Sequence, residues 1–215
     1  MVESPVSKES MASSIVNFRL AKSKNPCVCF SGGKNSLAVL HMVKMQDPSR
    51  LTVIHADAGS EFIEVQSYIQ KIKKLWKFNL IIVKKDDLTE DVLSKKPCIC
   101  KSWTATILAE IVSKNKYDCI FIGENLESGN FLSEEFKKYP DLFSITVCPL
   151  AMCSNDDIWN YIRIHTIPIC SLYDKGYQEI GCILCGQKAD LTPQNSQGQA
   201  DEKIMKEKLR KLGYL

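Results

Sequence analysis

The amino-acid sequence predicts an α/β protein with a parallel, twisted sheet and helices on both faces. Short apolar runs alternate with segments of helical periodicity over about the first two thirds of the chain. The first apolar run ends at two glycines, and a helical pattern follows them directly. The length of 215 residues and the hydrophobic content of 45% suit one globular domain covering residues 1–215.

Each element of this domain is expected from a local pattern. Short runs of apolar and β-branched residues predict strands, and apolar residues at helical spacing predict helices. The strands are expected at 27–30, 51–56, 80–83, 119–122 and 145–148, and the helices at 15–20, 37–45, 62–75 and 103–112.

The last part of the chain, residues 154–215, is expected to be a C-terminal extension. Ser154 with Asp157 three residues later has the pattern of a capping box and predicts a helix at 158–164. Residues 173–186 have no clear period, so we expect an irregular segment that contains cysteines. A polar loop is expected at 191–200 and a charged helix at 203–212.

Composition limits the partners and the compartment. A net charge of +3 is too small to argue for a nucleic-acid or membrane partner. Apolar runs do not reach the roughly 18 residues of a membrane helix, and the first residues lack a signal-peptide core. We therefore expect a cytosolic protein with reduced thiols, in which ten cysteines do not form a disulfide framework.

The glycine-rich turn at 31–36 is expected to bind an anion. Two glycines after a strand allow a sharp turn, and the helix that follows adds unpaired amides and its positive dipole end. The spacing is neither that of the P-loop nor that of the dinucleotide fingerprint. The residues of this turn are Ser31, Gly32, Gly33, Lys34, Asn35 and Ser36; the serines can add hydroxyl donors and the lysine a positive charge.

Three segments carry a resemblance to known proteins. Residues 30–36 resemble the PP-loop of the ATP-pyrophosphatase superfamily. Together with residues 55–64 and 167–185, in the same order, they resemble the phosphoadenylyl-sulfate and adenylyl-sulfate reductases. The resemblance covers about residues 15–186 and implies an adenine nucleotide alpha-hydrolase-like fold. It further implies that the PP-loop binds the phosphates of an adenosine nucleotide, and that Ala56 and Asp57 lie along its adenine and ribose.

Two cysteine pairs form a candidate metal site. Thiolates at the spacing Cys182-x-x-Cys185 chelate metals well, and Cys98 and Cys100 form a second pair. Spacing alone leaves a structural zinc, a 4Fe-4S cluster and unpaired thiols open. The resemblance to adenylyl-sulfate-type reductases implies the cluster, with Cys98, Cys100, Cys182 and Cys185 as ligands.

The remaining cysteines and the histidine beside the second strand receive other expectations. Cys27, Cys29, Cys119 and Cys148 lie on expected strands and are interpreted as core residues, and Cys153 and Cys170 have no assigned role. His55, at the end of the second expected strand, is interpreted as structural.

The chain also departs from the family pattern. Asn35 replaces the PP-loop aspartate, and Asn125 stands where the family has an arginine. An amide lacks the guanidinium charge that recognises sulfate and phosphate. The nucleophilic cysteine of the family's C-terminal tail is also missing, so the nucleophile is unknown.

Three functions remain in competition. The first is a phosphoadenylyl-sulfate or adenylyl-sulfate reductase-like enzyme that uses an external thiol reductant such as thioredoxin. The second is an ATP-dependent sulfurtransferase that modifies tRNA or DNA, the only case with a nucleic-acid partner. The third is a non-catalytic protein that binds a nucleotide and a cluster.

Overall fold

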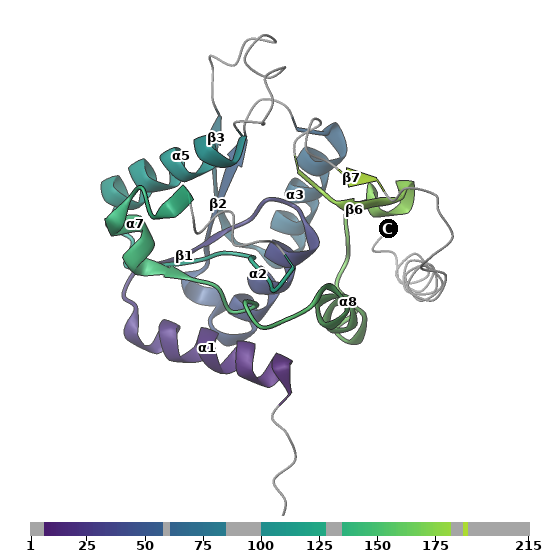
Figure 1. Ribbon diagram of the computed structural model, residues 1–215, viewed down its shortest axis with the longest axis horizontal. Coiled ribbons are helices and arrows are strands. Elements are labelled where there is room, and N and C mark those ends of the chain that lie inside the picture. Colours follow the sequence, from purple (N-terminus) through teal and green to yellow (C-terminus); the bar gives the residue numbers. More distant parts are fainter. Residues whose placement is uncertain (1–6, 58–60, 85–99, 128–134, 182–186, 189–215) are drawn as a thin grey trace, which may run out of the picture.

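Five parallel strands form the central sheet of the computed structural model, which describes residues 7–57, 61–84, 100–127, 135–181 and 187–188. The strand order is β3-β2-β1-β4-β5 (Figure 1). Their bounds are β1 Pro26–Cys29, β2 Thr52–Asp57, β3 Asn79–Lys84, β4 Cys119–Phe121 and β5 Thr146–Val147. The prediction of a parallel sheet is therefore confirmed.

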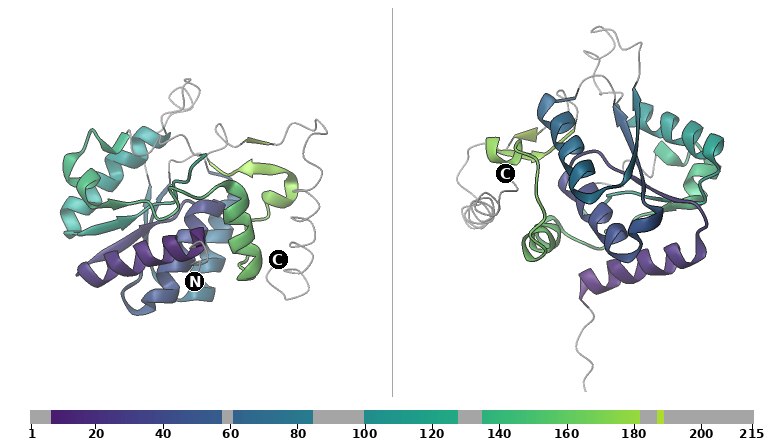
Figure 2. Two further views of the ribbon diagram at one scale, coloured as in Figure 1. Left: turned by 60° about the horizontal axis from the view of Figure 1, so that its bottom comes forward. Right: turned by 180° about the vertical axis from the view of Figure 1, so that it is seen from behind.

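Helices cover both faces of this sheet (Figures 1 and 2). One face packs against α1, α2, α3 and α8, and the other against α5 and α7. The helices are α1 Lys8–Lys22, α2 Lys34–Gln46, α3 Ile63–Trp76, α5 Cys100–Asn115, α7 Pro140–Ile145 and α8 Asn155–Ile164, with short 3-10 helices η1 Pro48–Arg50 and η2 Tyr173–Lys175.

Alternation along β1 explains why the strand is buried on both sides. Val28 and Phe30 point into the cluster beneath α2 and α3, whereas Cys27 and Cys29 belong to the cluster beneath α5. All four side chains are at most 8% exposed. The interpretation of these two cysteines as core residues is confirmed.

Two helices differ from their expected bounds. α1 starts at Lys8 rather than near residue 15, because Ser7 caps it and Ala12, Val16 and Leu20 form a buried stripe. α7 was not expected, since a helix of six residues is too short to show periodicity. It begins with Pro140, which suits a first helical position.

The expected irregular segment around residues 173–186 contains regular structure at its edges. η2 is followed by β6, Tyr177–Glu179, which pairs antiparallel with β7, Gln187–Lys188, in a second small sheet. The capping box of α8 is confirmed: Ser154 and Asp157 each bind the other's backbone amide. The expected loop at 191–200 and helix at 203–212 lie outside the described residues.

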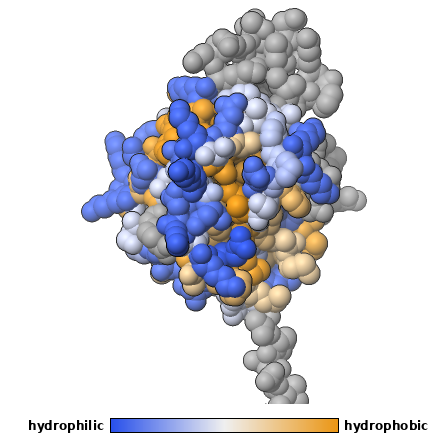
Figure 3. Space-filling view, turned by 90° about the vertical axis from the view of Figure 1, so that its left-hand side faces the viewer, coloured by the Kyte–Doolittle hydropathy of each residue, from blue (hydrophilic) through white to orange (hydrophobic). Residues whose placement is uncertain are grey.

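An open groove of about 450 Å³ separates α1 from β5. Ile15 and Phe18 of α1 line it together with Val147 and Cys148. Apolar residues also emerge among hydrophilic ones on the side of the molecule seen in Figure 3. No helix in the described part of the chain is long and apolar enough to span a bilayer.

Candidate functional site

The turn at residues 31–36 lies where the strand order reverses. β1 sits between β2 and β4, so chain order runs outward from it in both directions. Ligands of open α/β sheets bind in the crevice at such a point, beyond the carboxyl ends of the strands. Gly33 is the N-cap of α2, so the amides of the first helical turn and the positive end of the dipole lie at this edge.

Hydrogen bonds between its own residues hold the turn in shape. The Ser31 amide donates to Ser36 Oγ at 3.2 Å, and the two hydroxyl oxygens lie 3.0 Å apart. Ser36 Oγ in turn donates to the Gly33 carbonyl at 3.0 Å. The hydroxyl groups expected to contact an anion therefore also fix the backbone that would surround it.

The fold requires glycine at two positions, one within this turn and one beside it. Gly32 has φ +82°, and a Cβ there would lie 2.8 Å from Val65 Cγ1. Gly123, just after β4, approaches the start of α2 so closely that a Cβ would lie 2.4 Å from the Ser36 amide nitrogen. Gly33 differs, because a Cβ there would meet no protein atom closer than 3.5 Å. A Cβ at Gly33 would thus be in ordinary van der Waals contact, so packing alone does not require glycine there.

Lys34 is buried, and its charge is paired inside the protein. The side chain is only 2% exposed, and its ammonium forms an ion pair with Glu179 of β6. It also donates to the Gln178 carbonyl at 3.4 Å. The sequence suggested a cation available to an anion in the turn, whereas the structure places it against β6. Asn35, the next residue, is half-buried in the first turn of α2.

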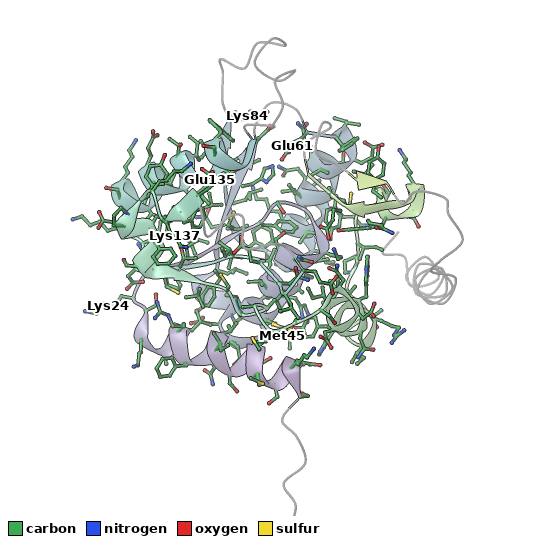
Figure 4. The ribbon with its side chains drawn as sticks, in the orientation of Figure 1. Lys24, Met45, Glu61, Lys84, Glu135 and Lys137 are labelled. Atoms are coloured by element: carbon green, nitrogen blue, oxygen red, sulfur yellow. The ribbon has the colours of Figure 1, made fainter. Side chains whose placement is uncertain are left out.

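The carboxyl end of β2 brings the two other predicted nucleotide residues to the same edge. Ala56 is half-buried and Asp57 is 4% exposed. Lys84 Nζ, at the end of the neighbouring β3, lies 3.8 Å from Asp57 Oδ2. Figure 4 shows Lys84 and Glu61 at this edge of the molecule.

His55 joins this edge to the turn. Its Nδ1 lies 2.8 Å from the Phe30 carbonyl, and its Nε2 lies 2.9 Å from Glu61 Oε2. Burial lowers the pKa of His55, but hydrogen bonds to Glu61 and Phe30 and the charges of Glu61 and Asp57 outweigh it, so the net pKa is raised. The imidazolium form donates to both acceptors at once. His55 therefore has a structural role, as expected.

Sequence reasoning missed the partners of these residues. Glu61 lies within residues 55–64, which the resemblance had marked, yet its side chain carried no signal of its own. Glu179 is separated from Lys34 by 145 residues, so no local pattern connects them. Tyr173, whose hydroxyl accepts from the Lys34 amide at 2.7 Å, lies in the third resemblance segment, which was a usable signal.

Asn125, in the position of the family's arginine, belongs to a packed polar contact. The side chain is 2% exposed, and Nδ2 donates to Asn155 Oδ1 at 3.2 Å. Asn155 in turn donates to both carboxylate oxygens of Glu127. The segment after β4 is thereby fixed to the start of α8.

The cysteines with described side chains are poor thiolates. Burial is the largest cause of a raised pKa in each of the six, and it raises the pKa of both Cys29 and Cys148 to about 12. Cys153 and Cys170, the two without an assigned role, are 4% and 0% exposed. A thiol in such surroundings is inert as a nucleophile.

The predicted metal ligands cannot be placed together. Cys98, Cys182 and Cys185 lie outside the described residues, and Cys100 is the first residue of α5. Among the side chains that are described, no group of three or more potential ligands is arranged to hold a metal ion. The chain entering the second pair is described up to Gly181, and its Ile180 carbonyl lies 3.5 Å from a Cβ built on Gly33.

Known proteins are similar to this chain in sequence or in fold. Over 200 residues the chain is 25% identical to an adenosine 5'-phosphosulfate reductase of Bacillus cereus, covering 81% of this chain and 79% of that protein. The phosphate complex of phosphoadenylyl-sulfate reductase from Candida auris superposes with a TM-score of 0.63 at 15% identity, covering 82% and 90% of the two chains. The U34-tRNA thiolase of Methanococcus maripaludis, solved with its 4Fe-4S cluster, gives 0.56 at 18% identity, covering 93% and 72%.

The family assignment rests on a match to a family model over most of the chain. The model of the phosphoadenosine phosphosulfate reductase domain matches residues 25–188, from β1 to β7. This range includes the glycine turn, the carboxyl ends of all five strands and both cysteine pairs. The chain therefore belongs to the phosphoadenosine phosphosulfate reductase domain family.

Proposed function

We propose that this protein binds an adenosine nucleotide at residues 31–36 and acts as a sulfonucleotide reductase-like enzyme. One observation carries the proposal: the segment that leads into Cys182 lies directly on the glycine turn. Tyr173 accepts a hydrogen bond from the Lys34 amide, and the Ile180 carbonyl lies next to Gly33. Cys182 follows Ile180 by two residues, a span of at most about 7 Å. This proximity supports a site in which thiol chemistry acts next to bound phosphate.

The nucleotide is proposed to use the amides of the turn and the edge of β2. Its phosphates would occupy the start of α2 beside Gly33, and its adenine and ribose would pass Ala56 and Asp57. This placement follows the rule that ligands bind at the reversal of strand order.

The two cysteine pairs are proposed to hold a 4Fe-4S cluster, with zinc as the alternative. The residues would be Cys98, Cys100, Cys182 and Cys185. Thiolate sulfur is the usual ligand of such clusters, and a thiolase with this fold carries one. A bound cluster would supply charge close to the phosphates. The cysteine spacing and the position of Gly181 support this assignment.

The reducing thiol is proposed to come from outside the described part of the chain. A thiolate attacks the sulfur of adenylyl sulfate or phosphoadenylyl sulfate, and the S–O bond to the nucleotide breaks. A second thiolate then releases sulfite and leaves a disulfide, so two thiols are oxidised for each sulfonate reduced. The described cysteines are buried with raised pKa values, so a dithiol protein such as thioredoxin is the proposed reductant.

A second candidate is an ATP-dependent sulfurtransferase acting on tRNA or DNA. The absence of arginine from the carboxyl ends of β1, β2 and β4 favours it. The chain contains Arg19, Arg50, Arg163 and Arg210, and none follows β1, β2 or β4 at the carboxyl edge of the sheet. Asn125, where the family has its arginine, is bound to Asn155. ATP bound with its metal ion carries less uncompensated negative charge than free phosphoadenylyl sulfate, so it needs fewer protein cations.

Labelled adenylyl sulfate and a dithiol reductant separate the two candidates. We expect labelled sulfite to form with purified, anaerobically prepared protein. ATP consumption that depends on added tRNA or DNA, with no release of sulfite, would replace the reductase by the sulfurtransferase.

Substitution of Gly33 by valine tests the nucleotide site. The backbone at this position, φ −79° and ψ 159°, suits a β-branched residue, so folding should be retained. The added side chain would enter the space proposed for the phosphates, and we expect adenine-nucleotide affinity to fall by at least about tenfold in calorimetry. Thermal unfolding is the control. Unchanged affinity in a folded variant would remove the nucleotide site from residues 31–36.

Metal analysis tests the cluster. Protein purified without oxygen should be brown and contain about four irons per chain. Serine at Cys182 or Cys185 should remove the colour, whereas serine at Cys27, a buried core residue, should not. A colourless protein with stoichiometric zinc would establish the alternative metal.

A further inference from the structure

Lys34 is an unusual residue for the first turn of a helix at a sheet edge. Its side chain is 2% exposed, whereas its partner Glu179 is 49% exposed. Taking an ammonium out of water is costly unless it is paired and hydrogen-bonded. Here the carboxylate of Glu179 and the carbonyl of Gln178 meet that need. Both acceptors come from β6, and neither belongs to the glycine turn.

Contacts of the neighbouring backbone reinforce the same junction. The hydroxyl of Tyr173 accepts from the Lys34 amide at 2.7 Å, and the Ile180 carbonyl lies against Gly33. Residues on both sides of β6 therefore rest on residues 33–34. Gly181 and Cys182 come next in the chain.

In this geometry Lys34 cannot both contact a phosphate and hold β6. To contact a phosphate, the ammonium would have to leave both of its acceptors in β6. To hold β6, it needs to stay where it is. Among the side chains that the structure describes, no other cation is recorded as pairing with Glu179.

We infer that Lys34 is a positioning residue that ties β6, and with it the chain leading into Cys182, to the glycine turn, rather than a ligand of the nucleotide phosphates. The inference rests on the proposed function only in taking residues 31–36 as the nucleotide site. It assigns Glu179 as the partner through which the tie acts. The anion site then depends on backbone amides and hydroxyl groups alone within the turn.

Three variants distinguish the tie from a phosphate contact: Lys34→Met, Glu179→Gln and the double variant. If Lys34 and Glu179 act only on each other, the three variants should change adenine-nucleotide affinity in the same direction. Their dissociation constants should then agree within about twofold. If Lys34 binds phosphate, Glu179→Gln frees the ammonium and raises affinity, whereas Lys34→Met lowers it. Opposite signs would overturn the inference.

Hydrogen exchange gives a readout that does not depend on nucleotide. Each of the three variants should speed exchange of the amides at 177–181 by at least about tenfold, because β6 loses its attachment. Lys74→Met, which removes an exposed lysine from α3, is the matched control and should leave those amides unchanged. Unchanged exchange in Lys34→Met would overturn the tie, even if the wild-type protein proved not to bind nucleotide and the proposed function failed.

Discussion

His55 lies between two hydrogen-bond acceptors, and this makes its protonation part of the fold. The Phe30 carbonyl faces one ring nitrogen and the Glu61 carboxylate the other. Because the pKa of His55 is raised in the folded protein, its contribution to stability is fully present below its unfolded value of about 6.5. That contribution is lost as the pH rises through the folded pKa. The side chains are 3% and 10% exposed, so solvent screens them little.

The first prediction concerns Glu61→Gln. At pH 6 the variant should unfold more easily than the wild type, by about 1–3 kcal/mol, because a buried charged hydrogen bond is lost. At pH 9 the difference should be smaller, since a larger fraction of His55 is then neutral in the wild type. Denaturant unfolding at both pH values measures it. Glu110→Gln, at an exposed position of α5, is the control. An equal difference at both pH values would show that His55 is not charged.

The buried thiols lead to a second prediction at this scale. Iodoacetamide added to the native protein should leave Cys153 and Cys170 unmodified, because burial raises the pKa of both thiols. Both should react after unfolding, which is the internal control. With adenylyl sulfate, no sulfonate adduct is expected on either residue, and turnover should require added dithiol. Intact and peptide mass spectrometry measure this; an adduct on Cys153 or Cys170 would make the enzyme self-sufficient.

The element that connects the sheet to the residues around the turn is α8. Its first turn is closed by Ser154 and Asp157, and Lys8 of α1 reaches the same carboxylate at 2.6 Å. The hydrogen bond from Lys8, followed by those from the amide and hydroxyl of Ser154, lowers the pKa of Asp157 to about 2. The stabilisation is therefore present above the unfolded pKa of 3.8 and is lost as the pH falls towards 2.

The third prediction tests this cap. Asp157→Ala should lower the free energy of unfolding by about 1 kcal/mol at pH 7, because the backbone amide of the N-cap residue Ser154 loses its acceptor. For a domain of this size the melting temperature should fall by about 2–4 °C. Asp156→Ala, at an exposed position of the same turn, should have a smaller effect. Similar losses in the two variants would mean that the helix dipole, and not the capping box, matters here.

Most elements could be predicted from the sequence because their signals are local. The apolar run at 27–30 and the glycines after it mark β1 and the turn without help from any other part of the chain. The start of α1 was missed because its first turn, from Lys8, contributes no residue to the buried stripe, which begins at Ala12. What could not be predicted are contacts between distant residues: Lys34 with Glu179, and Tyr173 with the Lys34 amide. These contacts decide how the turn is surrounded, and they depend on packing that no local period encodes.

For the molecule as a whole, the strand order explains why the candidate site has contributions from both ends of the chain. β1, β2 and β3 extend the sheet in one direction and β4 and β5 in the other, so the glycine turn lies between the two halves. The chain then returns through α8 and places η2 and β6 on the turn (Figure 1). Residues near 30, 57, 123 and 180 are thereby gathered at one edge.

The close approach of Gly123 to α2 determines which side of the candidate site can accept new side chains. The backbone of Gly123 lies so close to that of Ser36 that no side chain fits between them. The contact between the end of β4 and the start of α2 therefore cannot change by substitution. The opposite wall, η2 and β6, is attached by side chains: polar contacts to the turn, the ion pairs Lys34–Glu179 and Lys175–Glu64, and the core packing of Tyr173. The wall at Gly123 is thus fixed by backbone contact, whereas the wall formed by η2 and β6 is held by side chains that substitution can change. The surroundings of the turn could therefore be redesigned through residues 173–181 while the sheet is left untouched.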